Sequence, residues 1–121
     1  MTKTAVVTGA SSGIGAATAR ALADDGWHVI CAARRVERIE PLSAEIGGQA
    51  VVCDVTSDES VTNLVKTVGG KVDLLVNNAG GAVGQEPVAA ADLDAWMTMY
   101  QTNVLGMGRV TKALLPALEI A

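Results

Sequence analysis

Three glycines near the N-terminus constrain the fold of this chain more than any other feature. The apolar run 4–8 leads directly into the sequence GASSGIG at residues 9–15, and a segment with helical spacing follows at residues 14–25. Glycine permits a tight turn between a strand and a helix, and its missing side chain lets another group approach the backbone. The sequence therefore predicts a β-strand, a glycine-rich turn and a helix whose first N–H groups are free to bind an anion.

Each glycine of this turn has an expected role. Gly9 permits the turn, Gly13 lets a pyrophosphate approach the backbone, and Gly15 lets the helix pack closely against the sheet. A turn with only a structural role is the alternative, but its place at the start of a βαβ unit favours nucleotide binding. No Gly-Lys-Ser/Thr follows, which disfavours phosphoryl transfer. The expected cofactor-binding residues of the turn are Gly9, Ser11, Ser12, Gly13, Ile14 and Gly15.

The rest of the chain alternates short apolar runs with helical patterns. Further strands are expected at 27–33, 50–53 and 72–76, and helices at 36–46, 57–68 and 92–118. Pro41 predicts a shortened start or a kink in its helix. The strands are continuous apolar runs, which is typical of a parallel sheet covered on both faces. The order predicts an α/β, Rossmann-type doubly wound parallel sheet with strand order 3-2-1-4 between two helical layers.

Two arginines, Arg34 and Arg35, follow the second expected strand. In a dinucleotide-binding fold this point reaches the adenosine ribose, where an acidic residue would accept a hydrogen bond from a free 2′-hydroxyl. Two guanidinium groups instead suit a 2′-phosphate through charge-assisted hydrogen bonds. The alternative is that both arginines only open a solvated helix. A positive pair at this place, on a chain of net charge −4, favours NADP(H) over NAD(H).

Composition argues against several classes of protein. The acidic balance disfavours nucleic-acid binding, and no apolar run is long enough to cross a bilayer. With no targeting segment visible, the expected location is the cytoplasm. Two cysteines and one histidine cannot supply a four-ligand zinc site, so no metal is expected. Cys31 and Cys53 lie in expected strands and are expected to be buried, reduced thiols.

These residues and three further clusters resemble the short-chain dehydrogenase/reductase family over essentially the whole chain. The clusters are Asp54-Val55, Asn77-Asn78-Ala79-Gly80 and Asn103-Val104-Leu105-Gly106. The resemblance implies that Asp54 contacts the adenine with help from the backbone at Val55, and that Asn78, Ala79 and Gly80 line the cofactor. It also implies that Asn103 is the family's catalytic asparagine, which holds a water in a proton relay. Turn chemistry is a second explanation for the adjacent asparagines.

Within the family, residues 77–115 are similar to the branch that contains serine and 3-hydroxy acid dehydrogenases. The similar residues are GQEP at 84–87 and DAW at 94–96. The ketoacyl-reductase and general carbonyl-reductase branches share much of this segment.

The resemblance also shows what the sequence lacks. The family's chemistry needs a Ser, a Tyr that acts as general acid/base, and a Lys four residues after that Tyr. Tyr100 is the only tyrosine, and the residue four positions after it is Val104, not Lys. Tyr100 also precedes Asn103 on the same expected helix. The chain ends at Ala121, where a fifth strand is expected. We therefore expect residues 1–121 to be a dinucleotide-binding Rossmann domain, truncated before strand five and without the catalytic Ser, Tyr and Lys.

Two functions remain open from the sequence. The first is an NADP(H)-dependent oxidoreductase that transfers hydride between the nicotinamide and a small-molecule carbonyl or secondary alcohol, with this chain as its inactive N-terminal half. The second is a non-catalytic dinucleotide-binding module or truncated gene product. The resemblance implies a homodimer or homotetramer, in which the last helix packs against its mate.

Overall fold

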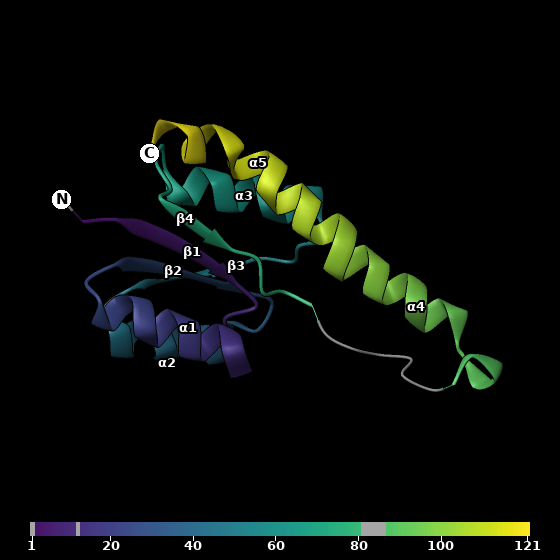
Figure 1. Ribbon diagram of the computed structural model, residues 1–121. Coiled ribbons are helices and arrows are strands. Elements are labelled where there is room, and N and C mark those ends of the chain that lie inside the picture. Colours follow the sequence, from purple (N-terminus) through teal and green to yellow (C-terminus); the bar gives the residue numbers. More distant parts are fainter. Residues whose placement is uncertain (1, 12, 81–86) are drawn as a thin grey trace.

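A four-stranded parallel sheet forms the centre of the structure (Figure 1). The structure is a computed structural model that describes residues 2–11, 13–80 and 87–121. The strands are β1 (Thr4–Thr8), β2 (His28–Ala33), β3 (Gln49–Val52) and β4 (Leu74–Val76). They pair in parallel in the order β3-β2-β1-β4, which confirms the predicted topology.

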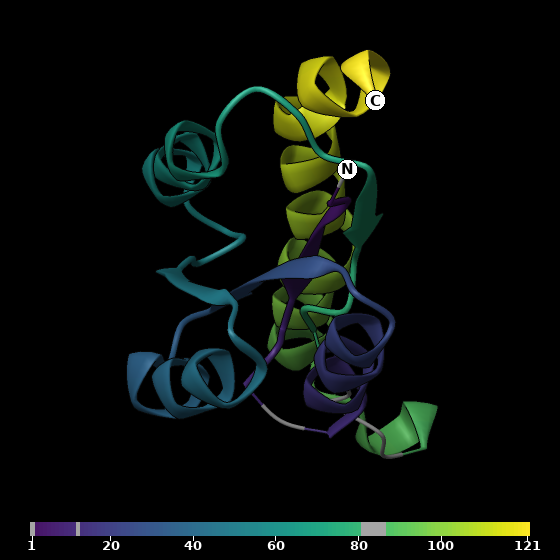
Figure 2. The ribbon, with the colours of Figure 1, turned by 90° about the vertical axis from the view of Figure 1, so that its left-hand side faces the viewer.

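Helices cover both faces of the sheet, as Figures 1 and 2 show. On one face lie α1 (Gly13–Asp24) and α2 (Val36–Ile46), and on the other lie α3 (Asp58–Val68) and α5 (Met107–Ile120). Successive strand residues point to opposite faces, so Val6 and Val7 belong to two different apolar clusters. The three-layer α/β/α architecture is therefore confirmed.

Local sequence signals explain most helix ends. The Ser57 hydroxyl caps α3 by accepting a hydrogen bond from the Ser60 N–H at 3.2 Å. Gly47 ends α2 in the left-handed region at φ 68°. Of the two effects expected of Pro41, the shortened start is not found, because α2 begins at Val36 and runs through Pro41.

The last helix differs from its prediction. Residues 92–118 are expected to form one regular helix, but the structure has α4 (Leu93–Met99), a π-helical segment η2 (Tyr100–Gly106) and then α5. The three run on as one rod that extends beyond the sheet (Figure 1). A π-helix hydrogen-bonds each residue to the fifth before it, and hydrophobic periodicity does not reveal such a segment. A short 3-10 turn, η1 (Val88–Ala90), precedes α4.

Both cysteines are buried and free of disulfides. Cys31 lies in β2, whereas Cys53 lies just after β3 and not within it. Burial raises the pKa of both thiols. Across residues 2–11, 13–80 and 87–121, no helix is long and apolar enough to cross a membrane. The same residues contain no group of three or more His, Cys, Asp or Glu side chains that could hold a metal ion.

Candidate functional site

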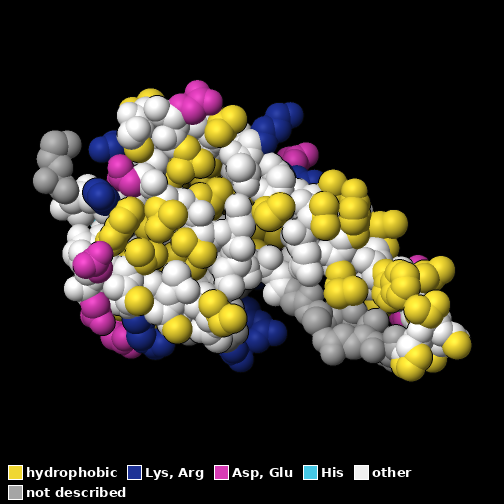
Figure 3. Space-filling view, viewed as in Figure 1, with side chains coloured by type: hydrophobic (Ala, Val, Ile, Leu, Met, Phe, Trp, Pro, Cys, Tyr) yellow, Lys and Arg dark blue, Asp and Glu magenta, His cyan; other side chains and the backbone are white. Residues whose placement is uncertain are grey.

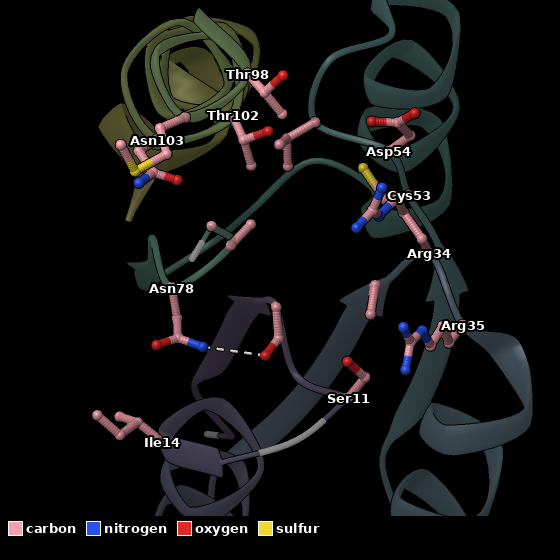
Figure 4. Close-up of a pocket in the computed structure, with 16 residues that line it drawn as sticks. Ser11, Ile14, Arg34, Arg35, Cys53, Asp54, Asn78, Thr98, Thr102 and Asn103 are labelled. Carbon is pink, nitrogen blue, oxygen red and sulfur yellow. Dashed lines mark hydrogen bonds between the residues drawn. The ribbon is translucent and has the colours of Figure 1, made fainter. Parts of the chain in front are cut away.

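A cavity of about 520 Å³ lies where the four strands end (Figure 4). Its walls come from the segments that follow β1, β2, β3 and β4, and from the rod formed by α4 and η2. Ligands of open parallel sheets bind outside the carboxyl ends of the strands, and cavities of this size hold small organic ligands. The lining residues are Gly9, Ser11, Ile14, Ala33, Arg34, Arg35, Cys53, Asp54, Val55, Asn78, Ala79, Gly80, Thr98, Met99, Thr102 and Asn103.

The glycine turn packs directly against the segment after β4. Gly9 has φ 62°, and a Cβ atom there would lie 2.8 Å from both the Ala79 Cα and the Asn78 carbonyl oxygen. A Cβ atom at Gly15 would overlap the Gly9 carbonyl oxygen and lie 2.5 Å from the Asn78 Nδ2. Only glycine fits both positions. Gly13, at φ 59°, instead has open space around it.

Thr8, at the end of β1, connects the two segments through its side chain. The buried Thr8 hydroxyl accepts hydrogen bonds from the backbone N–H groups of Asn78 and Ala79, each at 3.0 Å. It also donates to the Val76 carbonyl oxygen at 3.3 Å. The Asn78 side chain returns a hydrogen bond to the Gly9 carbonyl oxygen at 3.0 Å, drawn as the dashed line in Figure 4. These hydrogen bonds connect the end of β1 to Asn78 and Ala79, which line the cavity.

One side of the cavity carries positive charge. Arg34 and Arg35 are both exposed, and they lie with Asp54 on the side opposite Asn78 and Ile14 (Figure 4). The Asp54 carboxylate accepts from the Thr56 hydroxyl at 2.7 Å and from the Thr56 N–H at 2.9 Å. These hydrogen bonds hold the pKa of Asp54 below its usual value, and the charge of Arg34 acts in the same direction. The carboxylate is therefore ionised at neutral pH.

The rod brings Asn103 to the remaining side of the cavity. Asn103 lies in the π-helical segment, and its side chain packs against Gly80, which has φ 134°. A Cβ atom at Gly80 would overlap the Asn103 Oδ1. This close approach places Asn103 beside the segment after β4. Tyr100 is half exposed and does not line the cavity.

The cavity brings together most of the predicted site residues. They are Gly9, Ser11, Ile14, Arg34, Arg35, Asp54, Val55, Asn78, Ala79, Gly80 and Asn103. Gly13 and Gly15 do not line it, because Gly13 faces open space and Gly15 packs behind the turn. Ser12 lies outside the described residues, as do residues 84–86 of the segment compared with the serine dehydrogenase branch.

Five lining residues were not predicted. Ala33 and Cys53 are the last residues of two expected strands, and Thr98, Met99 and Thr102 lie in the expected helix 92–118, without an expected role at the site. The last three lie on the same side of the rod as Asn103. Helical spacing back from Asn103 could have identified only Met99, four residues before it, because Thr98 and Thr102 do not lie three or four residues from Asn103.

Comparison with known proteins identifies the family. The family model described as short chain dehydrogenase matches residues 3–120. The chain belongs to the short-chain dehydrogenase family. This confirms the resemblance on which the roles of Asp54, Asn78 and Asn103 were based.

Three relatives of the short-chain dehydrogenase family illustrate the similarity. An uncharacterized oxidoreductase of Mycobacterium tuberculosis is 59% identical over 96% of this chain and 46% of its own length. A serine 3-dehydrogenase of Rhizobium radiobacter is 42% identical over 98% of this chain and 49% of its own length. A solved structure, the closed form of serine dehydrogenase complexed with NADP+, is 34% identical with a TM-score of 0.89. The match covers 95% of this chain and 48% of the chain in that structure. The chain thus spans about half the length of the relatives it matches.

Proposed function

We propose that this chain is the NADP(H)-binding part of a short-chain dehydrogenase. The observation that carries the proposal is the cavity at the strand ends, which is lined by both the glycine turn and the pair Arg34 and Arg35. The similarity to a serine dehydrogenase complexed with NADP+ supports the same cofactor. The cavity volume and its mixture of backbone, amide and guanidinium groups fit a dinucleotide.

Each wall of the cavity has a proposed part in binding. The start of α1 presents backbone N–H groups to the pyrophosphate, with Gly13 leaving the approach open. Arg34 and Arg35 bind the 2′-phosphate, and Asp54 and Val55 contact the adenine. Asn78, Ala79 and Gly80 line the path along the sheet toward the nicotinamide end.

We propose hydride transfer between the nicotinamide and a carbonyl or secondary alcohol as the activity of the whole protein. The bound nicotinamide supplies the hydride chemistry, and the protein orients it. Asn103 is the proposed catalytic residue of this chain, since it lies at the cavity beside Gly80. The relatives that are serine dehydrogenases make small 3-hydroxy acids the first substrate class to assay.

A second candidate is a dinucleotide-binding module without turnover. It is favoured by the sequence, in which Val104 and not Lys stands four residues after the only tyrosine, Tyr100. The intact mass of the protein from its native source distinguishes the two candidates, since a mass about twice that of this chain favours the oxidoreductase. Both candidates predict that the purified 121-residue chain binds NADPH but does not oxidise it with small carbonyl substrates. Binding without turnover supports the role of the chain as the cofactor-binding part. Turnover by residues 1–121 alone would contradict the assignment of the acid/base chemistry to residues outside them.

Cofactor preference tests the role of Arg34. Replacing Arg34 with Asp removes a phosphate ligand and supplies an acceptor for a free 2′-hydroxyl, so the preference for NADPH over NADH should fall by about tenfold or more. Arg38→Asp is the control: it makes the same charge change on the exposed surface of α2 but does not line the cavity. Dissociation constants for both cofactors measure the effect. An equal change in both variants would show that Arg34 acts only through its charge.

Assembly and location are further proposals. We propose a homodimer or homotetramer, because the rod exposes large apolar side chains that Figure 3 shows gathered at its extended end. The exposed large apolar residues along the whole rod are Leu93, Trp96, Met97, Tyr100, Val104, Leu105, Met107, Leu115 and Ile120. Sedimentation equilibrium measures the oligomeric state. The cytoplasmic location and a small-molecule carbonyl or alcohol substrate stay predictions.

A further inference from the structure

Arg109, on α5, reaches across to the segment between β3 and α3. Its Nη1 donates to the Val55 carbonyl oxygen at 2.7 Å, and its Nε donates to the Asp58 carboxylate at 2.7 Å. The Arg109 side chain is 25% exposed, whereas the Asp58 side chain is 90% exposed. Arg109 itself does not line the cavity, but Val55 does.

Packing also holds the rod against the segment between β3 and α3. Gly106 lies one helical turn before Arg109, and a Cβ atom there would lie 2.6 Å from the Val55 Cγ2. Val55 is buried, so the rod and the segment after β3 meet without a gap at this residue. The hydrogen bond from Arg109 and the contact at Gly106 therefore fix the backbone and the side chain of Val55.

Hydrogen bonds also form within the segment after β3 and to the first turn of α3. The Asp54 N–H donates to the Ser60 hydroxyl at 2.8 Å, and the Asp54 carboxylate accepts from Thr56 as described above. The Ser57 N–H donates to the Asp54 carbonyl oxygen at 3.0 Å. These bonds make residues 54–57 a compact unit, so a displacement at Val55 also displaces the Asp54 carboxylate.

We propose that Arg109 is a positioning residue for the cofactor, since it holds the Asp54–Val55 wall in place for the adenosine half. The inference rests on the proposed function, because it needs NADP(H) in this cavity. Arg34 directly follows β2, and Asp54 follows the neighbouring β3, so the two lie at the end of the cavity that receives the 2′-phosphate and adenine. A wall that is held in place before binding spares the ligand the cost of ordering it.

The two contacts of Arg109 differ in importance. The ion pair with Asp58 lies in water and contributes little. The bond to the Val55 carbonyl is charge-assisted and partly buried, and losing it leaves that carbonyl without its donor. Variants of Arg109 and of Asp58 can therefore separate the effect of the ion pair from that of the hydrogen bond to Val55.

The test compares Arg109→Met, Arg109→Lys and Asp58→Asn with the unaltered protein. Calorimetry measures the dissociation constants of NADPH and of adenosine 2′,5′-bisphosphate, which contains only the adenosine half, at a temperature where circular dichroism shows each variant folded. Arg109→Met should raise the dissociation constants of both ligands by the same factor, about fivefold. Arg109→Lys should recover part of the affinity, and Asp58→Asn should keep nearly all of it.

Arg20→Met is a matched control. It removes an exposed ion pair in which Arg20 Nε lies 2.8 Å from Glu45 Oε2, and neither residue lines the cavity. It should leave both dissociation constants unchanged. Unchanged bisphosphate binding in Arg109→Met would overturn the positioning role of Arg109 but not the proposed function. An equal loss of affinity in Arg20→Met would do the same. If Arg109→Met does not fold, Arg109→Lys carries the test, and unaltered affinity there overturns the inference. Failure of the unaltered protein to bind either ligand would instead overturn the proposed function.

Discussion

Replacing Gly15 with alanine should destabilise the fold by about 3 kcal/mol. The added Cβ would overlap the Gly9 carbonyl oxygen and lie 2.5 Å from the Asn78 Nδ2. Neither neighbour can retreat easily, because the Gly9 carbonyl accepts the hydrogen bond from that same Nδ2. The start of α1 would have to move away from the sheet. Chemical denaturation measures the free energy of unfolding.

Helix propensity alone predicts the opposite sign, which makes Gly15→Ala diagnostic. Alanine in a helix is favoured over glycine by about 1 kcal/mol where space permits. Gly108 offers the matched control, since it lies inside α5 and a Cβ there would meet no atom within 4 Å. Gly108→Ala should therefore keep or raise the stability. A Gly15→Ala variant as stable as Gly108→Ala would contradict the close packing of the glycine turn against the segment after β4.

Replacing Thr8 with valine should have the second large effect. Valine keeps the shape of the side chain but removes the acceptor for two backbone N–H groups, those of Asn78 and Ala79. Leaving two such donors without a partner costs on the order of 3 kcal/mol. Because these donors lie in the segment that lines the cavity, NADPH affinity should also fall, by about tenfold.

Thr8→Ser separates the hydroxyl from the methyl group. Serine keeps the acceptor and loses only buried methyl volume, so it should retain most of the affinity and lose about 1 kcal/mol of stability. Thermal unfolding and NADPH titration of both variants provide the measurements. If Thr8→Val bound NADPH as tightly as Thr8→Ser, the hydroxyl would not be holding the segment after β4.

The sheet could be predicted from the sequence because its signals are local. Continuous apolar runs mark the four strands, and the glycine turn and Ser57 mark the starts of two helices. Right-handed crossovers then leave one strand order. The site residues that follow strands were also accessible, since the carboxyl ends of parallel strands meet at one edge.

Other features could not be predicted because they depend on contacts between distant residues. Thr8 bonds the backbone of Asn78 and Ala79, about seventy positions further along the chain. The π-helical segment is set by backbone hydrogen bonds that leave no pattern in side-chain polarity. Without it, the sequence could not show that Thr98 and Thr102 face the cavity with Asn103.

The most direct test of the account is a comparison of the dissociation constants of NADPH and NADH at the same ionic strength. Arg34 and Arg35 at the end of β2, with no acidic residue at that point, predict that NADPH binds at least about tenfold more tightly than NADH. The difference should shrink as salt is raised, because exposed guanidinium–phosphate pairs are screened. Equal affinities, or tighter binding of NADH, would contradict the assignment of this cavity to NADP(H).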